Sequence, residues 1–282
     1  MKLLRFGPPG GERPGLMDAD GRVRDLSSHI SDITGAALAP DNLAKLAAID
    51  PTTLPQIYGA PRMGPCIGRA SKFIAVGLNY SDHAAEAGQP IPAEPILFQK
   101  AVSCIVGAND EVMLPRNSVK LDWEVELGVV IGVKARYVEV SAALDHVAGY
   151  CIVNDVSERE FQLERLGQTT KGKSSDTFGP IGPWLVTKDE VPDPHNLGMF
   201  CDVNGQRRQS GSTSKMIFGV PFLVSYISSF MTLMPGDIIA TGTPAGVGLG
   251  MQPPRYLKAG DVMRLGIDGL GEQRQKVVPF RL

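Results

Sequence analysis

The stretch that most limits how this chain can fold reads DWEVELGVVIG and covers residues 122–132. It alternates as a β-strand does, and successive side chains of a strand point to opposite faces of its sheet. One face would carry Trp123, Val125, Leu127, Val129 and Ile131. The other would carry Asp122, Glu124 and Glu126, followed by Gly128 and Val130. Because the acidic face continues with apolar residues, the pattern indicates a sheet covered on both sides, where unpaired carboxylates are rare.

The two glutamates of this stretch need a partner if that face is covered. Glu124 and Glu126 would lie about 7 Å apart along one strand face, and like charges repel strongly in a medium of low dielectric constant. Either one carboxyl group takes up a proton or a cation lies between them. The alternation alone leaves two alternatives open, a solvent-facing strand and a metal or acid–base site.

A third acid favours the metal site. Asp155 ends the apolar run GYCIVND, and a helix is predicted directly after it over residues 157–167, with Ser157 and Glu160 as a capping box. Functional side chains concentrate at such junctions between strand and loop, although aspartate there is also ordinary turn chemistry. Three carboxylates without a neighbouring His or Cys ligand favour a hard cation. Mg²⁺ fits best, and Mn²⁺ and Ca²⁺ remain open.

Composition excludes several other classes of protein. The 282 residues include 28 basic and 30 acidic side chains, and no basic block is interleaved with aromatics, so nucleic acid is not an expected partner. No apolar run approaches the ~20 residues of a membrane-spanning helix, so no membrane partner is expected either. The four cysteines form no CxxC pair, which is typical of reduced thiols in a cytoplasmic protein.

The order of predicted elements indicates a β-rich α+β fold. Strand patterns dominate from Lys72 onward, and helices do not alternate regularly with them, which disfavours Rossmann and TIM architectures. A further helix is predicted over 220–231, beginning at Pro221, with aromatic and aliphatic side chains on one apolar face. Near the N-terminus, Asp20–Gly21 predicts a hairpin with a two-residue turn. Four prolines within residues 51–65 predict a linker.

Seven segments of the chain, in order, resemble the fumarylacetoacetate hydrolase family. They read VGLNYSDHAAEAG, PILFQK, DWEVELGVVIG, GYCIVNDVSER, KSSDTFGPIGPWLV, VNGQRRQSGSTSKMIF and LMPGDIIATGTPAGVG. The resemblance covers residues 69–282 and implies a catalytic domain with the family's mixed-sheet roll or barrel core. Residues 1–68 would form a small N-terminal α+β domain and the proline-rich linker. The resemblance also implies a divalent metal, usually Mg²⁺, and commonly a homodimer.

The same resemblance assigns the metal ligands. Glu124, Glu126 and Asp155 match the family's three metal-binding acids. Asp122 matches no ligand despite its favourable position in the alternation, and we expect it at the rim of the site or behind the ligands.

The candidate catalytic residues are His83, Glu86 and Lys173. His83 and Glu86 are three residues apart and share a face of one helical turn. Alone, they would be an ordinary surface pair. Beside a metal site, a carboxylate that orients an imidazole gives a base able to deprotonate water. In the family this pair lies on a segment that folds over the substrate. The resemblance also matches Lys173, rather than Lys171, with an active-site lysine.

The candidate substrate-binding residues are Arg159, Gln162 and Thr243. All three match family positions that contact the carboxylate end of the substrate. Alternatively, Arg159 and Gln162 would be ordinary polar residues on the surface of a helix, and Thr243 would only form part of a turn.

The reaction that the resemblance implies is hydrolysis of a carbon–carbon bond in a 2,4-dioxo acid. The products would be pyruvate and a second carboxylic acid. Within the family, the chain is most similar to bacterial members labelled ureidoglycolate lyase or 2,4-dioxo-3-deoxy-sugar-acid hydrolase of the fuconate type. Ureidoglycolate lyase, isomerisation of a hydroxy-diene dioate and oxaloacetate decarboxylation are alternatives. A metal-stabilised scaffold without turnover is the alternative outside enzymes.

Overall fold

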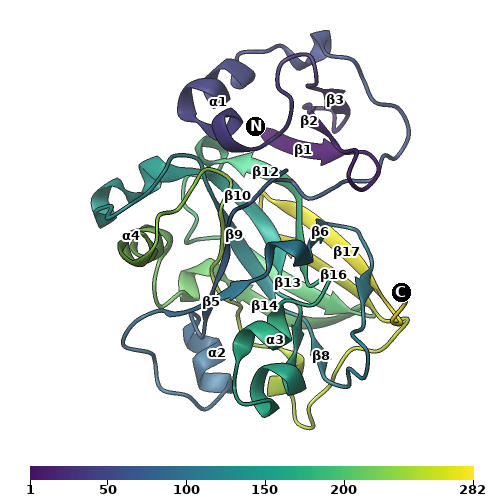
Figure 1. Cartoon of the computed structure of the whole chain (residues 1–282), viewed down its shortest axis with the longest axis vertical. Helices are drawn as coiled ribbons and strands as arrows, with labels where there is room; N and C mark the ends of the chain where they lie inside the picture. The colour runs from purple at the N-terminus through teal and green to yellow at the C-terminus, as the bar shows by residue number, and fades with distance from the viewer.

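The computed structural model describes all 282 residues and shows a strand-rich α+β protein, which confirms the predicted fold class (Figure 1). Its largest sheet has ten strands. In spatial order they are β3 (Val23–Asp25), β2 (Arg13–Met17), β1 (Lys2–Phe6), β12 (Gly179–Thr187), β10 (Val147–Asn154), β9 (Val125–Ile131), β15 (Ile238–Ala240), β4 (Phe73–Gly77) and β5 (Ile96–Lys100), with β6 (Ile105–Gly107) beside β12. The sheet is mixed, because β15 runs parallel to β4 and β6 parallel to β12.

Two smaller sheets accompany it. The five-stranded sheet has the order β14 (Gln206–Ser212), β13 (Gly198–Val203), β16 (Val262–Ile267), β17 (Gly271–Val278) and β7 (Val112–Met113). The two-stranded sheet pairs β11 (Ser157–Glu158) with β8 (Leu121–Asp122). The strand order of each sheet is open at both ends, so the expected core is present without closing into a barrel.

Helices are few and short. The α-helices are α1 (Pro40–Ala47), α2 (Ser81–Glu86), α3 (Thr169–Lys173) and α4 (Val220–Phe230), and a π-helix covers Glu160–Glu164. The 3-10 turns cover Gly35–Leu38, Pro51–Thr53, Val102–Cys104, Val140–His146, Lys188–Glu190, Thr213–Lys215 and Gly248–Gly250. None of the helices is both long enough and apolar enough to cross a membrane.

The N-terminal strands extend the main sheet. Lys2 pairs with Val186 of β12, so residues 1–25 continue the sheet that carries β9 and β10. Figure 1 shows β1–β3 at the end of the molecule opposite to α2 and α3. The division between residues 68 and 69 stays a prediction. The hairpin is present, but its turn is longer than predicted: Asp18 N–H donates to Arg22 O, and Gly21 has φ +76°.

The acidic stretch forms two strands, where the alternation predicted one. β8 ends at Asp122, and β9 begins only at Val125. All seven residues of β9 are buried, which confirms that its sheet is covered on both faces. β10 lies antiparallel beside it, with Val125 opposite Asn154. The three acids therefore come from two neighbouring strands and from the residues at their ends.

The predicted capping box at Ser157 is wrong. Ser157 lies in β11 and its hydroxyl donates to the carbonyl oxygen of Asp155, so it does not cap the next helical turn. The helix is a single π-turn from Glu160. The carboxylate of Glu158 accepts from the N–H of Phe161 at its start, at 2.8 Å.

Helix α4 also differs in part from the prediction. Leu223, Val224 and Ile227 face the core. On the outer side Phe222 stacks on Tyr226, and Tyr226 meets Phe230 edge to face, where Phe230 is 63% exposed.

Candidate active site

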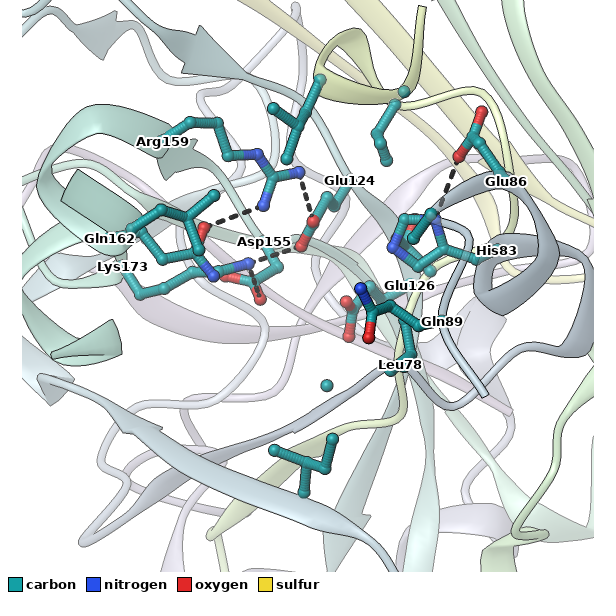
Figure 2. A pocket seen from close by; sticks show the side chains of 18 of the residues that line it. Leu78, His83, Glu86, Gln89, Glu124, Glu126, Asp155, Arg159, Gln162 and Lys173 are labelled. Carbon is teal, nitrogen blue, oxygen red and sulfur yellow. Dashed lines mark hydrogen bonds and ion pairs between the residues drawn. The ribbon is translucent and has the colours of Figure 1, made fainter. Parts of the chain in front are cut away.

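One cavity of about 690 Å³ gathers all nine of the predicted site residues. They are His83, Glu86, Glu124, Glu126, Asp155, Arg159, Gln162, Lys173 and Thr243. Figure 2 shows the acids between two groups of side chains, with Arg159 and Lys173 on one side and His83 and Glu86 on the other. Residues separated by as many as 160 positions in the sequence thus share one site.

The strand pairing brings the three acids together. Glu126 lies in β9, Glu124 precedes this strand, and Asp155 directly follows β10. The N–H of Asp155 donates to the carbonyl oxygen of Glu124 at 2.9 Å, which joins the two chain segments. The three residues are buried, and one carboxylate oxygen from each lies within 4.8 Å of the others.

Cationic side chains hold two of the acids. Lys173 Nζ donates to Glu124 Oε2 at 2.5 Å and to Asp155 Oδ2 at 2.7 Å. Arg159 Nη2 donates to Glu124 Oε1 at 2.5 Å. Burial alone would raise the pKa of Glu124, but these two charges outweigh it and the pKa is lowered. The pKa of Lys173 is raised despite burial, because Asp155 and Glu124 favour its charged form.

Glu126 is in a different electrostatic environment. Its Oε2 accepts a 2.8 Å hydrogen bond from the N–H of Gly242, but no cationic side chain bonds to it. Burial raises its pKa well above the ordinary value, and the charges of Asp155 and Glu124 raise it further. Without a cation at the site, this raised pKa favours the protonated form of Glu126, the first of the two alternatives for a covered acidic face.

The three acids also fit a divalent metal ion. Asp155 Oδ1 is buried and accepts no hydrogen bond, although Lys100 Nζ lies 2.6 Å away as an ion pair outside hydrogen-bond geometry. The hydrogen bond to Glu126 goes to Oε2, and Oε1 accepts none. A set of ligand atoms made only of carboxylate oxygens, some of which accept no hydrogen bond, is what a hard cation such as Mg²⁺ or Mn²⁺ binds.

His83 and Glu86 form the predicted pair on α2. His83 Nδ1 lies 3.0 Å from Glu86 Oε2, and both side chains are largely shielded from solvent. The second oxygen of Glu86 accepts from the N–H of Gly246 at 2.8 Å, which ties α2 to the loop after β15. The carboxylate thus fixes the ring by one nitrogen and leaves Nε2 for chemistry.

Arg159 is held from behind by Asp122. Asp122 is fully buried, so it is not at the rim of the site. Its Oδ2 accepts from Arg159 Nε at 2.9 Å. Asp122 Oδ1 accepts from the N–H of Gly248 at 2.7 Å, and Oδ2 accepts also from the N–H of Leu249 at 3.0 Å. Arg159 Nη1 in turn donates to Gln162 Oε1 at 3.0 Å, so these two residues face the same way.

The hydroxyl of Thr243 is already engaged within the protein. It donates to Val125 O at 2.9 Å and accepts from Gln209 Nε2 at 2.8 Å. The backbone N–H of Thr243 makes no hydrogen bond within the protein and is the donor that remains for a carboxylate.

Sequence reasoning missed two residues that shape the site. Lys100 is buried at the end of β5, and its ammonium group also donates to the carbonyl oxygens of Val156 and Lys173. Gln209 of β14 is buried and holds Thr243 and the N–H of Val125. Lys100 does end the segment PILFQK, where a lysine after an apolar strand was the available signal.

Comparisons with known proteins identify the family of the chain. The family model described as fumarylacetoacetate (FAA) hydrolase C-terminal matches residues 72–278. A Burkholderia multivorans protein, provisionally named a hydrolase, is 62% identical over 276 residues, which are 98% of each chain.

Two solved structures show the range of activities among the relatives. One is maleylpyruvate hydrolase from Sphingobium sp. SYK-6 in complex with manganese(II) ion and pyruvate, with a TM-score of 0.83, 30% identity and coverage of 100% of both chains. The other is 2-hydroxyhepta-2,4-diene-1,7-dioate isomerase from Mycobacterium marinum, with a TM-score of 0.74, 34% identity and coverage of 99% of this chain and 98% of the other. The matched model, the close relative and the shared fold lead to one conclusion: the chain belongs to the fumarylacetoacetate hydrolase family.

Proposed function

We propose that this protein hydrolyses a carbon–carbon bond of a 2,4-dioxo acid of the acylpyruvate type, giving pyruvate and a second carboxylic acid, with Mg²⁺ as its metal and Mn²⁺ or Ca²⁺ as possible substitutes. One observation carries the proposal. The His83–Glu86 pair faces an acidic triad that fits a divalent cation, inside the same cavity. The family and its solved members support an enzyme of the hydrolase or isomerase kind.

The side chains divide the work of this reaction between them. A divalent cation held by the three acids would supply positive charge beside the substrate oxygens on which negative charge develops. Arg159 and Gln162 would bind the substrate carboxylate. His83, oriented by Glu86, takes a proton from water, whose oxygen attacks the C4 carbonyl carbon. The bond between C3 and C4 then breaks, and its electron pair stays with the pyruvate half as an enolate. Lys173 would help to protonate C3.

Two of the alternatives, the isomerase and the decarboxylase, use the same enolate chemistry. Dioate isomerisation and oxaloacetate decarboxylation need no attacking water, whereas the oriented His83–Glu86 pair is suited to activating one. Ureidoglycolate lyase and a 2,4-dioxo-3-deoxy sugar acid as substrate remain alternatives within the family. A scaffold without turnover leaves the pair unexplained, because neither residue belongs to the acidic triad that fits the metal.

An assay with acylpyruvates tests the proposal. The protein, stripped of metal and resupplied with Mg²⁺ or Mn²⁺, should remove the enol absorbance of acetylpyruvate and release one pyruvate per molecule consumed. Turnover of ureidoglycolate with no turnover of any dioxo acid would identify a lyase instead. Isomerisation of a hydroxy-diene dioate without pyruvate release would identify an isomerase, and turnover of oxaloacetate alone would identify a decarboxylase. A lack of all four activities would leave the scaffold.

We also propose a homodimer. Four rings adjoin one another in a row on and just before α4: Phe218, Phe222 and Tyr226 stack with centroid separations of 5.4 and 5.9 Å, and Tyr226 meets Phe230 edge to face at 4.9 Å. Phe222 and Phe230 are exposed, and aromatic surface of this kind marks interaction sites. Light scattering after gel filtration should give twice the mass of the 30.2 kDa chain. A monomer at micromolar concentration would contradict the proposal.

Replacing Asp122 with asparagine should raise KM for an acylpyruvate by about 10- to 100-fold, because a charge-assisted hydrogen bond contributes about 1.5–3 kcal/mol. The change removes the charge opposite Arg159 Nε and weakens the hold on Gly248 and Leu249. Steady-state kinetics measure it. Glu158→Gln is the matched control, since Glu158 is equally buried but lies outside the cavity. Equal losses in both variants would mean that Asp122 acts only on folding.

A further inference from the structure

We propose that the acyl group beyond C4 of the substrate is uncharged and apolar, an aliphatic or aromatic group, and that substrates ending in a second carboxylate are rejected. This inference rests on the proposed function and concerns the part of the substrate farthest from the metal.

The cationic groups of the cavity lie at its buried inner end. Its only permanent cations are Arg159 and Lys173. Arg159 is bonded to Asp122, Glu124 and Gln162, and Lys173 is bonded to Glu124 and Asp155. The N–H donors of Arg159 and Lys173 that remain lie nearest to the first carboxylate of the substrate, which we expect to bind them. No basic side chain is left for a second carboxylate.

The opening of the cavity is largely apolar. The exposed residues of its lining include the apolar Ile96, Leu163, Leu249 and Pro254, with Gln89 and Gln252 as the polar ones. Ile96 is 49% exposed, Leu163 53% and Leu249 37%. Three separate segments, β5, the π-helix and the loop after β15, thus direct partly exposed apolar side chains to one opening. Covering this surface with an apolar ligand would be favourable, because it removes apolar side chains from water.

A carboxylate in this place would be unfavourable for two reasons. It would lose water without gaining a cation, and burying an unpaired charge is costly. It would also lie in the same cavity as Glu86, which carries charge of the same sign. The next basic residue along the loop, Arg255, lines a different cavity together with Arg208 and Lys258.

The apolar wall is anchored to groups that the reaction uses. Gly246 N–H donates to Glu86, while Gly248 and Leu249 N–H groups donate to Asp122, the carboxylate that also holds Arg159. Because these backbone groups are already fixed, little conformational entropy is lost when a tail binds against them. We therefore expect the tail preference to appear in kcat/KM.

The test compares acylpyruvates that differ only in the tail. With Mg²⁺ present, kcat/KM should rise by about fourfold for each added methylene over the first few, the ratio expected for burial of one methylene. A tail ending in carboxylate should react at least about 100-fold less efficiently than the methyl-ended tail of equal length. Equal or better turnover of the carboxylate-ended substrate would overturn the inference.

Binding of N-alkyl oxamates separates this inference from the proposed function, because it needs no turnover. In the presence of Mg²⁺, thermal-shift titration should show affinity rising with alkyl length and falling for a carboxylate-ended tail. If no acylpyruvate is hydrolysed while the oxamates follow this order, the reaction is wrong and the tail assignment holds. Oxamate affinity that is indifferent to the tail, or higher with the carboxylate, overturns the assignment.

A change of charge at the mouth gives a second readout. Leu249→Arg should shift the ratio of kcat/KM for carboxylate-ended over methyl-ended substrates by at least about tenfold toward the carboxylate. Leu144→Arg is the matched control, because Leu144 is 38% exposed, against 37% for Leu249, and lies outside the cavity. An unchanged ratio in Leu249→Arg, or the same shift in both variants, contradicts the inference.

Discussion

Replacing His83 with glutamine should lower kcat for acylpyruvate hydrolysis by about 10²- to 10⁴-fold, the usual contribution of a general base. Glutamine can keep a hydrogen bond to Glu86 but cannot take up a proton from water. Because His83 is outside the acidic triad, the affinity for Mn²⁺ should stay within about twofold of the unchanged protein. Single-turnover kinetics and calorimetric metal titration measure the two quantities independently.

A control variant sharpens this test. His146→Gln is the matched control, since its ring bonds to the carbonyl oxygen of Val133 and lies outside the cavity. Loss of metal affinity in parallel with activity would make His83 a ligand or a structural residue.

The acidic site was predictable because its signals are local in sequence. Alternation placed Glu124 and Glu126 toward one side of a covered sheet, and the apolar run before Asp155 placed that acid at a strand end. Both inferences need only strand geometry. The spacing of His83 and Glu86 is likewise a property of one helical turn.

The supports of the site were not predictable in this way, because they depend on long-range contacts. Lys100 meets Asp155 across 55 residues, and Gln209 meets Thr243 across 34. The role of Asp122 depends on where the loop carrying Gly248 returns to the site. The hydrophobic pattern of a sequence does not predict which distant polar residues will pair.

The capping box at Ser157 failed for a related reason. The hydroxyl that would cap a helix bonds instead to the carbonyl oxygen of Asp155, and β11 pairs with β8. A local preference was overridden by pairing between strands, as often happens where chain segments meet. The consequence is functional, because this path brings Arg159 against Asp122 and Glu124.

Replacing Asp155 with asparagine should abolish metal binding at the site and, with it, hydrolysis. The change removes a charged ligand from a set of three and leaves Glu124 and Glu126 to hold a divalent cation alone. We expect Mn²⁺ affinity to fall by at least about 100-fold and added Mg²⁺ to stop raising the melting temperature, since ligand-linked stabilisation follows affinity.

The same variant should also be less stable without any metal. Asp155 is the carboxylate that Lys100 and Lys173 share, and all three side chains are buried. Breaking a buried ion pair by removing one partner typically costs about 3–5 kcal/mol, which urea unfolding in the presence of a chelator would measure. Asp202→Asn serves as the control, because Asp202 pairs with Arg207 and Arg264 away from the cavity. If Asp155→Asn instead kept full Mn²⁺ affinity, the three acids would form an ion-pair network and the metal would have to bind elsewhere.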